Sequence, residues 1–340
     1  MQFPASAYPL ASAVIPGGGL AHGGDGQLPP LTPGRIFQLD LDPFLSILLL
    51  AIAIAYLWGV YRLERRGDRW PVSRTLFFLL PGLGGLASVT LTGIGAYDTT
   101  LLSVHMVQHM VLSMVAPIFL ALGAPVTLAL RTLPRRGRRV LMSVLHSRPA
   151  RVLTFPLVAY GLFVATPFAL YFTDLYRLTL ENEWVHQLVH VHFVAVGCLF
   201  FWPLLGVDPL PGRWPYPARA LLMFLSTPFH TVLGLTIMQS TELIGGDWYP
   251  SLGLPWMDPA ADQRLAGGIL WAAGELVSVT MLVVLVVQWM RDAERENRRV
   301  DRQLDREEAA AARKAGGPPP AQPAQYDPHG SPDTQGVSRP

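Results

Sequence analysis

The sequence predicts an all-α membrane protein, a polytopic bundle of about seven transmembrane helices with its N-terminus outside and its C-terminus in the cytoplasm. Hydrophobic residues make up 51% of the 340 residues and charged residues only 15%, whereas a soluble domain carries about 25% charged residues. Several apolar runs are long enough to cross the ~30 Å hydrocarbon core of a bilayer. Basic residues are concentrated in alternate connections between these runs.

Seven apolar segments are candidate spans, and together they form a predicted membrane domain over residues 43–290. The segments cover residues 43–61, 73–92, 101–122, 151–171, 184–205, 218–239 and 266–290. The sequence PGLGG interrupts the second, which membrane helices tolerate where neighbours satisfy the freed backbone groups. Residues 1–42 are rich in Gly and Pro and predict a largely irregular extracytoplasmic leader. Residues 291–340 predict a charged cytoplasmic helix extension followed by a disordered Pro-rich tail.

The connections between these segments differ in charge, and this difference orients the bundle. The first and third are rich in Arg, the fifth carries Arg213, and the C-terminal tail opens with several more arginines. The second, fourth and sixth carry mostly Asp and Glu. Because basic loops remain in the cytoplasm, the odd connections are predicted to lie inside the cell. Cys198 is the single cysteine, which excludes a disulfide framework and a CxxC thiolate metal site.

Two histidines stand one helical turn apart in the third span. The segment LLSVHMVQHMVLSMVAPIFLAL contains His105 and His109, and i, i+4 spacing puts both imidazoles on one helix face. An ionisable side chain inside a bilayer is costly without a partner, so such residues are functional candidates. The predicted topology has this helix entering from outside, which places both histidines in the outer half of the membrane.

The fifth span repeats this spacing. In its sequence HQLVHVH, His186 and His190 share a face, while His192 points elsewhere. His230 falls in the outer half of the sixth span, and Glu275 falls in the outer half of the seventh. Five histidines on three helices and a carboxylate on a fourth are therefore predicted at similar depth in the outer leaflet.

This constellation predicts a metal site, because imidazole nitrogen suits copper, zinc or iron. The candidate ligands are His105, His109, His186, His190, His230 and Glu275. Two stacked haems are disfavoured, since an i, i+4 pair is separated by only ~6 Å of helical rise. One haem held by a histidine from each helix stays open. Glu275 has three open roles: metal ligand, proton carrier, or partner in a helix–helix hydrogen bond.

Three separated motifs carry a family resemblance. They are HMVQHMVLSMVAPIFLALGAPVTLALRTLP, HQLVHVHFVAVGCLFFWPLLGVDPLP and DQRLAGGILWAAGEL. In this order they resemble the CtaG family of bacterial cytochrome c oxidase assembly factors, over about residues 40–290. The resemblance implies a multi-pass protein of the bacterial plasma membrane that is needed for active haem–copper oxidase, at a copper-insertion step. It carries over His105, His109, His186, His190 and Glu275 as motif residues.

We expect a non-enzymatic assembly factor that holds copper transiently and passes it to a subunit of a haem–copper oxidase. The expected partners are that oxidase and the lipid bilayer, with no nucleic acid. The alternatives are a copper transport or resistance permease, and a membrane redox enzyme with haem or di-iron. The inner halves of the third, fifth and seventh spans are almost purely apolar, which favours a handling site over a transmembrane path.

Overall fold

The computed structural model describes residues 28–210 and 214–314. The secondary-structure elements in this part of the chain are all helices. Most of the predicted leader and the whole Pro-rich tail lie outside the described residues. The chain divides into two compact units, Met1–Val286 and Val287–Pro340. Every candidate site residue belongs to the first unit.

Within the described residues, six helices are long and apolar enough to cross a membrane. They are Pro43–Glu64, Val72–Thr90, Leu102–Thr132, Glu183–Leu205, Tyr216–Gln239 and Pro259–Ala311. A seventh crossing exists only if α11 (Pro156–Tyr171) and α12 (Leu175–Glu181), which are bent by 68°, form one span. The prediction of a helical multi-pass bundle is thus confirmed for six spans, and the fourth predicted span, residues 151–171, corresponds to α11, which is too short to count as a span without α12. The side on which each terminus lies stays a prediction.

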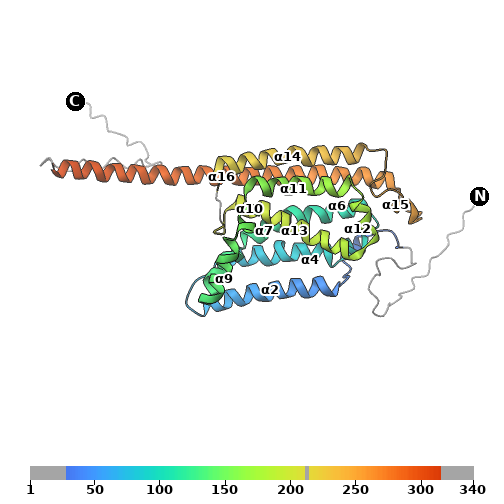
Figure 1. The fold of residues 1–340 in the computed structure, drawn as a ribbon, viewed down its shortest axis with the longest axis horizontal. Helices are drawn as coiled ribbons and strands as arrows, with labels where there is room; N and C mark the ends of the chain where they lie inside the picture. Colours follow the sequence, from blue (N-terminus) through green and yellow to red (C-terminus); the bar gives the residue numbers. More distant parts are fainter. Residues whose placement is uncertain (1–27, 211–213, 315–340) are drawn as a thin grey trace, which may run out of the picture. The chain divides into compact units, whose positions relative to one another are not determined.

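Several of these spans are built from shorter helices (Figure 1). The first span is α2 (Pro43–Glu64). The second consists of α3 (Val72–Phe77), η1 (Phe78–Gly84) and α4 (Gly85–Thr90). The third consists of α6 (Leu102–Met110), η2 (Val111–Val115), α7 (Ala116–Leu122) and α8 (Pro125–Thr132). The later spans contain α13 (Glu183–Leu205), α14 (Tyr216–Gln239) and α16 (Pro259–Lys314). The remaining short helices are α1 (Pro33–Ile36), α5 (Gly93–Tyr97), α9 (Arg135–Leu145), α10 (Arg148–Leu153) and α15 (Trp248–Ser251).

Prolines account for the two π-helical turns, η1 and η2. Pro81 lies inside η1, and Pro117 is the second residue after η2. Proline lacks an N–H and its ring clashes with the carbonyl four residues earlier, and a wider turn accommodates both effects locally. In the third span the hydroxyl of Ser113 also donates to the carbonyl of His109 at 2.7 Å. The third span therefore changes its winding directly after its two histidines.

The third span lies at the centre of the bundle. Of its apolar window 56% is buried, more than in any other candidate span, and α13 packs along η2 and α7. A Cβ on Gly197 of α13 would lie 2.2 Å from the carbonyl oxygen of Ser113. The two histidine-bearing helices can therefore approach this closely only with glycine at that position.

A buried carboxylate links the ends of these same two spans. Asp208, just after α13, accepts from the backbone N–H of Thr127 at 2.7 Å and from its hydroxyl at 2.6 Å. It therefore caps the first turn of α8. Burial raises the pKa of Asp208, although these hydrogen bonds act in the opposite direction. Asp208 thus has a structural role in holding α8.

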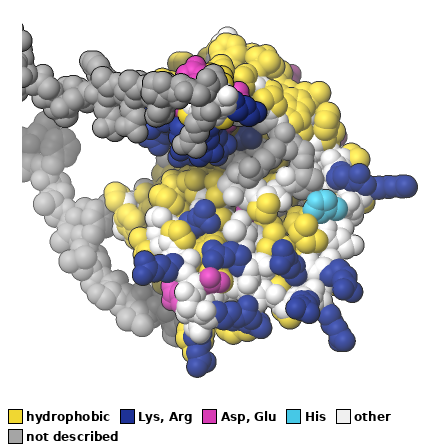
Figure 2. Space-filling model, turned by 90° about the vertical axis from the view of Figure 1, so that its left-hand side faces the viewer, with side chains coloured by type: hydrophobic (Ala, Val, Ile, Leu, Met, Phe, Trp, Pro, Cys, Tyr) yellow, Lys and Arg dark blue, Asp and Glu magenta, His cyan; other side chains and the backbone are white. Residues whose placement is uncertain are grey.

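The two ends of the bundle differ in the charge of their loops. Asp98, Asp174 and Asp247 lie in the connections next to α5, α12 and α15. Helices α12 and α15 lie at one end of the bundle (Figure 1). The other end carries α9, and Figure 2 shows many basic side chains and few acidic ones there. The alternation of charge along the sequence thus corresponds to opposite ends of the helices.

Residues just before the first span close the α5 end. Leu28 and Leu31 pack against a small separate core that contains Tyr97 and Leu101. The hydroxyl of Tyr97 donates to the carbonyl of Pro29 at 2.7 Å. This packing holds the start of the loop that carries Asp98.

Candidate metal site

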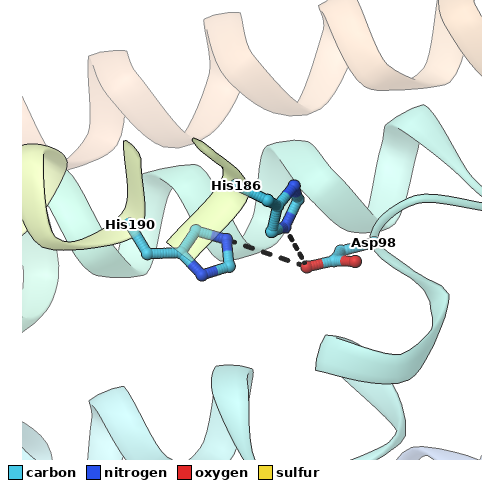
Figure 3. A group of neighbouring side chains, drawn as sticks. All are labelled: Asp98, His186 and His190. Carbon is cyan, nitrogen blue, oxygen red and sulfur yellow. Dashed lines mark hydrogen bonds and ion pairs between the residues drawn. The ribbon is translucent and has the colours of Figure 1, made fainter. Parts of the chain in front are cut away.

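Two histidines of α13 meet a buried carboxylate from the loop between α5 and α6 (Figure 3). The Nε2 atom of His186 lies 2.9 Å from Oδ2 of Asp98, and Nε2 of His190 lies 3.7 Å from the same oxygen. Exposure is only 1% for Asp98, 5% for His186 and 6% for His190. The i, i+4 spacing read from the sequence therefore directs both imidazoles toward one carboxylate.

A third imidazole, from α6, stands next to this group. The ring of His105 is centred 6.1 Å from that of His186 and 5.1 Å from that of Tyr176. Neither nitrogen of the buried His105 ring has a hydrogen-bond partner among the described residues, and the same holds for Oδ1 of Asp98. Buried polar atoms are nearly always paired. His105 lies outside the three donor atoms that stand within 4.8 Å of one another, and its two unpaired nitrogens make it the candidate for a further ligand.

The loop that carries Asp98 is held from two sides. The indole N–H of Trp248 donates to the carbonyl of Thr99 at 2.9 Å. Asp262, in the first turn of α16, accepts from the hydroxyl of Ser103 and, at 3.2 Å, from its backbone N–H. Asp262 therefore complements the N-terminus of α6 and fixes the turn from which His105 projects.

Asp98 lies between two spans, outside both of them. Burial on its own would raise the pKa of its carboxyl, but the imidazoles of His186, His190 and His105 outweigh burial and hold the pKa below its ordinary range. The carboxyl is therefore ionised, which is the form in which it binds a cation.

The geometry and the donor types fit a divalent metal ion. Ligand atoms around a tetrahedral ion at about 2.0–2.1 Å stand about 3.3 Å apart. One donor atom each from Asp98, His186 and His190 lies within 4.8 Å of the other two. Imidazole suits copper, zinc or iron, and a carboxylate favours Cu(II) over the softer Cu(I). The three side chains already stand near the spacing that a bound ion requires.

His109 lies one turn deeper and has a different partner. Its Nδ1 atom is 2.8 Å from the hydroxyl of Tyr171, and its ring is centred 4.2 Å from that of Phe193. The ring of Tyr171 also lies edge-on to that of His105, with centroids 6.1 Å apart. Both histidines of α6 therefore share one face of the helix. Only His105 lies beside Asp98, His186 and His190, which are together called the Asp98 group below.

The Tyr171→Phe variant tests whether the contact between Tyr171 and His109 stabilises the fold or contributes to metal binding. The change leaves the buried imidazole of His109 without its hydroxyl partner, which costs about 1–3 kcal/mol. We expect a lower thermal midpoint of the purified protein and unchanged copper retention, because the Asp98 group is intact. Loss of copper with unchanged thermal stability would instead make Tyr171 and His109 part of the metal site.

His230 and Glu275 lie outside the group of donor atoms around Asp98. His230, on α14, is buried beside Phe163, with ring centroids 5.5 Å apart. Glu275, on α16, is half-buried and accepts a hydrogen bond from the hydroxyl of Thr231 at 3.3 Å. This contact corresponds to the helix–helix hydrogen bond, one of its three predicted roles.

Asp98 is the member of the site that sequence reasoning does not single out. In the charge pattern of the sequence, Asp98 is one of several acidic residues in the second, fourth and sixth connections, and nothing marks it as a ligand. The available signal is its position, as the single charged residue of LTGIGAYDTT directly before the helix that carries His105. Only the approach of α13 to this loop identifies it as a partner of His186 and His190.

Apolar helices that enclose a buried carboxylate–imidazole group near one end define a polytopic membrane protein with a candidate metal site. The chain belongs to the cytochrome c oxidase caa3 assembly factor (Caa3_CtaG) family, whose sequence profile matches residues 54–292. The match includes Asp98 and all the candidate ligands. It confirms the resemblance based on three motifs.

Similar proteins also occur in mycobacteria. An uncharacterized protein of Mycobacterium bovis and one of Mycobacterium tuberculosis are each 40% identical over 289 residues, which cover 82% of this chain and 44% of the relative. An uncharacterized protein of Mycobacterium leprae is 37% identical over 272 residues, 78% of this chain and 41% of the relative. The chain thus spans less than half the length of these curated relatives. No solved structure matches it.

Proposed function

We propose that this protein is a non-enzymatic assembly factor of the bacterial plasma membrane that holds copper as cargo and passes it to a subunit of a haem–copper oxidase. The observation that carries the proposal is the convergence of Asp98, His186 and His190, whose donor atoms lie within 4.8 Å of one another. Membership of an oxidase assembly factor family supports the oxidase as recipient. Copper is the cargo that such an oxidase needs and that this donor set suits.

Each side chain has a distinct role in this proposal. Asp98 supplies the negative charge that compensates a buried cation, and His186 and His190 supply neutral nitrogen donors. His105 adds a fourth donor from the neighbouring helix. A site built from two helices and a loop can exchange one ligand at a time, which suits cargo that must be released as well as bound.

The apolar surroundings favour this function over transport. Below His109 the buried residues of the third span are apolar except for Ser113 and Thr132. The hydroxyls of both donate to backbone carbonyls of their own span, those of His109 and Leu128. The second half of α13, from Phe193 onward, reads FVAVGCLFFWPLL. A permease would need polar groups that continue toward the other side of the membrane. His105, His109, His186 and His190 instead all lie within the first eight residues of α6 or α13.

The proposal is tested in cells that lack the gene. We expect their haem–copper oxidase to retain haem but to lose copper and activity, while total cell copper stays unchanged. Complementation with the wild-type chain should restore the copper content of the oxidase. A change in total cell copper that accounts for the oxidase defect would support the permease, and a fully copper-loaded oxidase without this protein would refute the proposal.

A further inference from the structure

Helix α9 carries charged and apolar side chains on different sides, and none of its residues is buried. Arg135, Arg136 and Arg139 lie on one side at helical spacing. Val140 and Val144, one turn apart on another side, are 64% and 59% exposed. A helix with this pattern, apolar along one edge and rich in Arg along another, is typical of the membrane interface.

The orientation of α9 on the protein leaves the valine edge uncovered. Leu141 and Leu145 follow Val140 and Val144 by one residue and are half-buried, so α9 rests on the protein along their edge. At 100° per residue, the valine edge lies between this packed edge and the arginine edge. Around the helix axis, the packed leucine edge is therefore followed by the exposed valine edge and then by the arginine edge.

The same pattern continues into α10. The side chain of Ser147 accepts from the backbone N–H of Ala150 at 3.3 Å and caps this helix. Val152 and Phe155, which lead into α11, are exposed. Residues 131–155 contain no Asp or Glu, and their arginines are Arg131, Arg135, Arg136, Arg138, Arg139, Arg148 and Arg151.

The first span, α2, ends at the same end of the bundle as α9 (Figure 1) and carries two exposed aromatic rings there. The guanidinium of Arg62 lies 5.1 Å from the ring centroid of Trp58, and that of Arg65 lies 5.6 Å from that of Tyr61. Trp58 and Tyr61 are exposed. Such amphipathic rings mark the level of lipid headgroups, and α9 lies at this same end of the bundle (Figure 1).

We propose that the α9–α10 segment lies in the membrane interface, with Val140 and Val144 among lipid acyl chains and the arginines bound to phosphates of anionic phospholipids. A guanidinium pairs with phosphate through two parallel hydrogen bonds. Basic segments beside a span are attracted to anionic lipid surfaces. Exposed valines beside arginines, a stretch without Asp or Glu over residues 131–155, and exposed aromatic rings at the same end of the bundle together favour lipid over a protein partner as the occupant.

The insertion is tested with single labelled cysteines in the full chain. In a Cys198→Ala background, Val144→Cys and the adjacent control Ser143→Cys are each labelled with a polarity-sensitive fluorophore and reconstituted into phosphatidylcholine–phosphatidylglycerol vesicles. We expect quenching by a lipid-attached nitroxide at position 144 and quenching by aqueous iodide at position 143. Equal quenching at both positions would overturn the proposal, as would shielding of position 144 only after an oxidase is added.

The headgroup contact is tested by removing charge. We expect the purified wild-type protein to retain phosphatidylglycerol in preference to phosphatidylcholine. The quadruple variant Arg135→Gln, Arg136→Gln, Arg138→Gln, Arg139→Gln should lose this enrichment. The control removes the same charge from α16 through Arg298→Gln, Arg299→Gln, Arg302→Gln and Arg306→Gln, and should keep that enrichment. Unchanged enrichment in the α9 variant, or equal loss in the control, would overturn anionic headgroup binding by this segment.

Discussion

Purified Asp98→Asn protein is expected to retain at least about tenfold less copper than the wild type, because changing even a residue that only orients a metal ligand costs about 10–100-fold in affinity. Asn keeps the shape of the side chain, and its amide oxygen can still accept from Nε2 of His186, 2.9 Å away in the wild type. The variant therefore folds but lacks the negative charge that compensates a buried cation. The measurement is copper per polypeptide after dialysis against a fixed free copper concentration.

Glu275→Gln is the matched control, since it makes the same chemical change in another carboxylate of the bundle. Glu275 contacts Thr231 and lies outside the Asp98 group, so copper retention and oxidase activity in complemented cells should remain at wild-type levels. Equal copper loss in both variants would mean that the effect is not specific to the site. Full copper retention by Asp98→Asn would remove Asp98 from it.

A clear loss of stability is expected from Gly267→Ala. A Cβ at this position of α16 would lie 2.5 Å from the carbonyl oxygen of Gly234 and 2.7 Å from the backbone nitrogen of Met238. Backbone atoms of α14 cannot move aside as a flexible side chain can. We expect a loss of about 1–3 kcal/mol, the usual cost of overpacking, measured as a lower thermal midpoint in detergent.

The adjacent residue offers the control. A Cβ on Gly268 would meet no atom within 4 Å outside its own helix. Alanine there should leave stability unchanged or raise it by about 0.5–1 kcal/mol, because glycine is unfavourable within a helix. If Gly268→Ala destabilised the protein as much as Gly267→Ala, the close crossing of α14 and α16 would not be the cause.

Much of the fold follows from the sequence, because a membrane helix is defined by its length and its apolar composition. The break between α11 and α12 does not follow so directly. The hydroxyl of Thr173 accepts from the backbone N–H of Leu175 at 3.2 Å, which is a local turn that competes with helix. That turn directs α12 across the end of the bundle, where Tyr176 packs on His105.

The pairing of the histidines could be predicted from the sequence, because the period of an α-helix fixes which residues share a face. Helical spacing correctly paired His186 with His190 on one face, and it placed His105 and His109 on another. Spacing could not reveal that the carboxylate partner is Asp98, since loop residues approach a helix only through tertiary packing. It also could not show that His109, ~6 Å deeper by helical rise, bonds to Tyr171 instead.

The most direct test of copper handling is electron paramagnetic resonance of the purified full chain loaded with one equivalent of Cu(II). The proposed site predicts hyperfine coupling to imidazole nitrogens of His186 and His190. The coupling pattern should lose one nitrogen in His190→Ala, while His192→Ala leaves it unchanged. Cu(II) without imidazole coupling, a spectrum unaffected by His186→Ala and His190→Ala, or a Soret band from bound haem would contradict the proposed copper site.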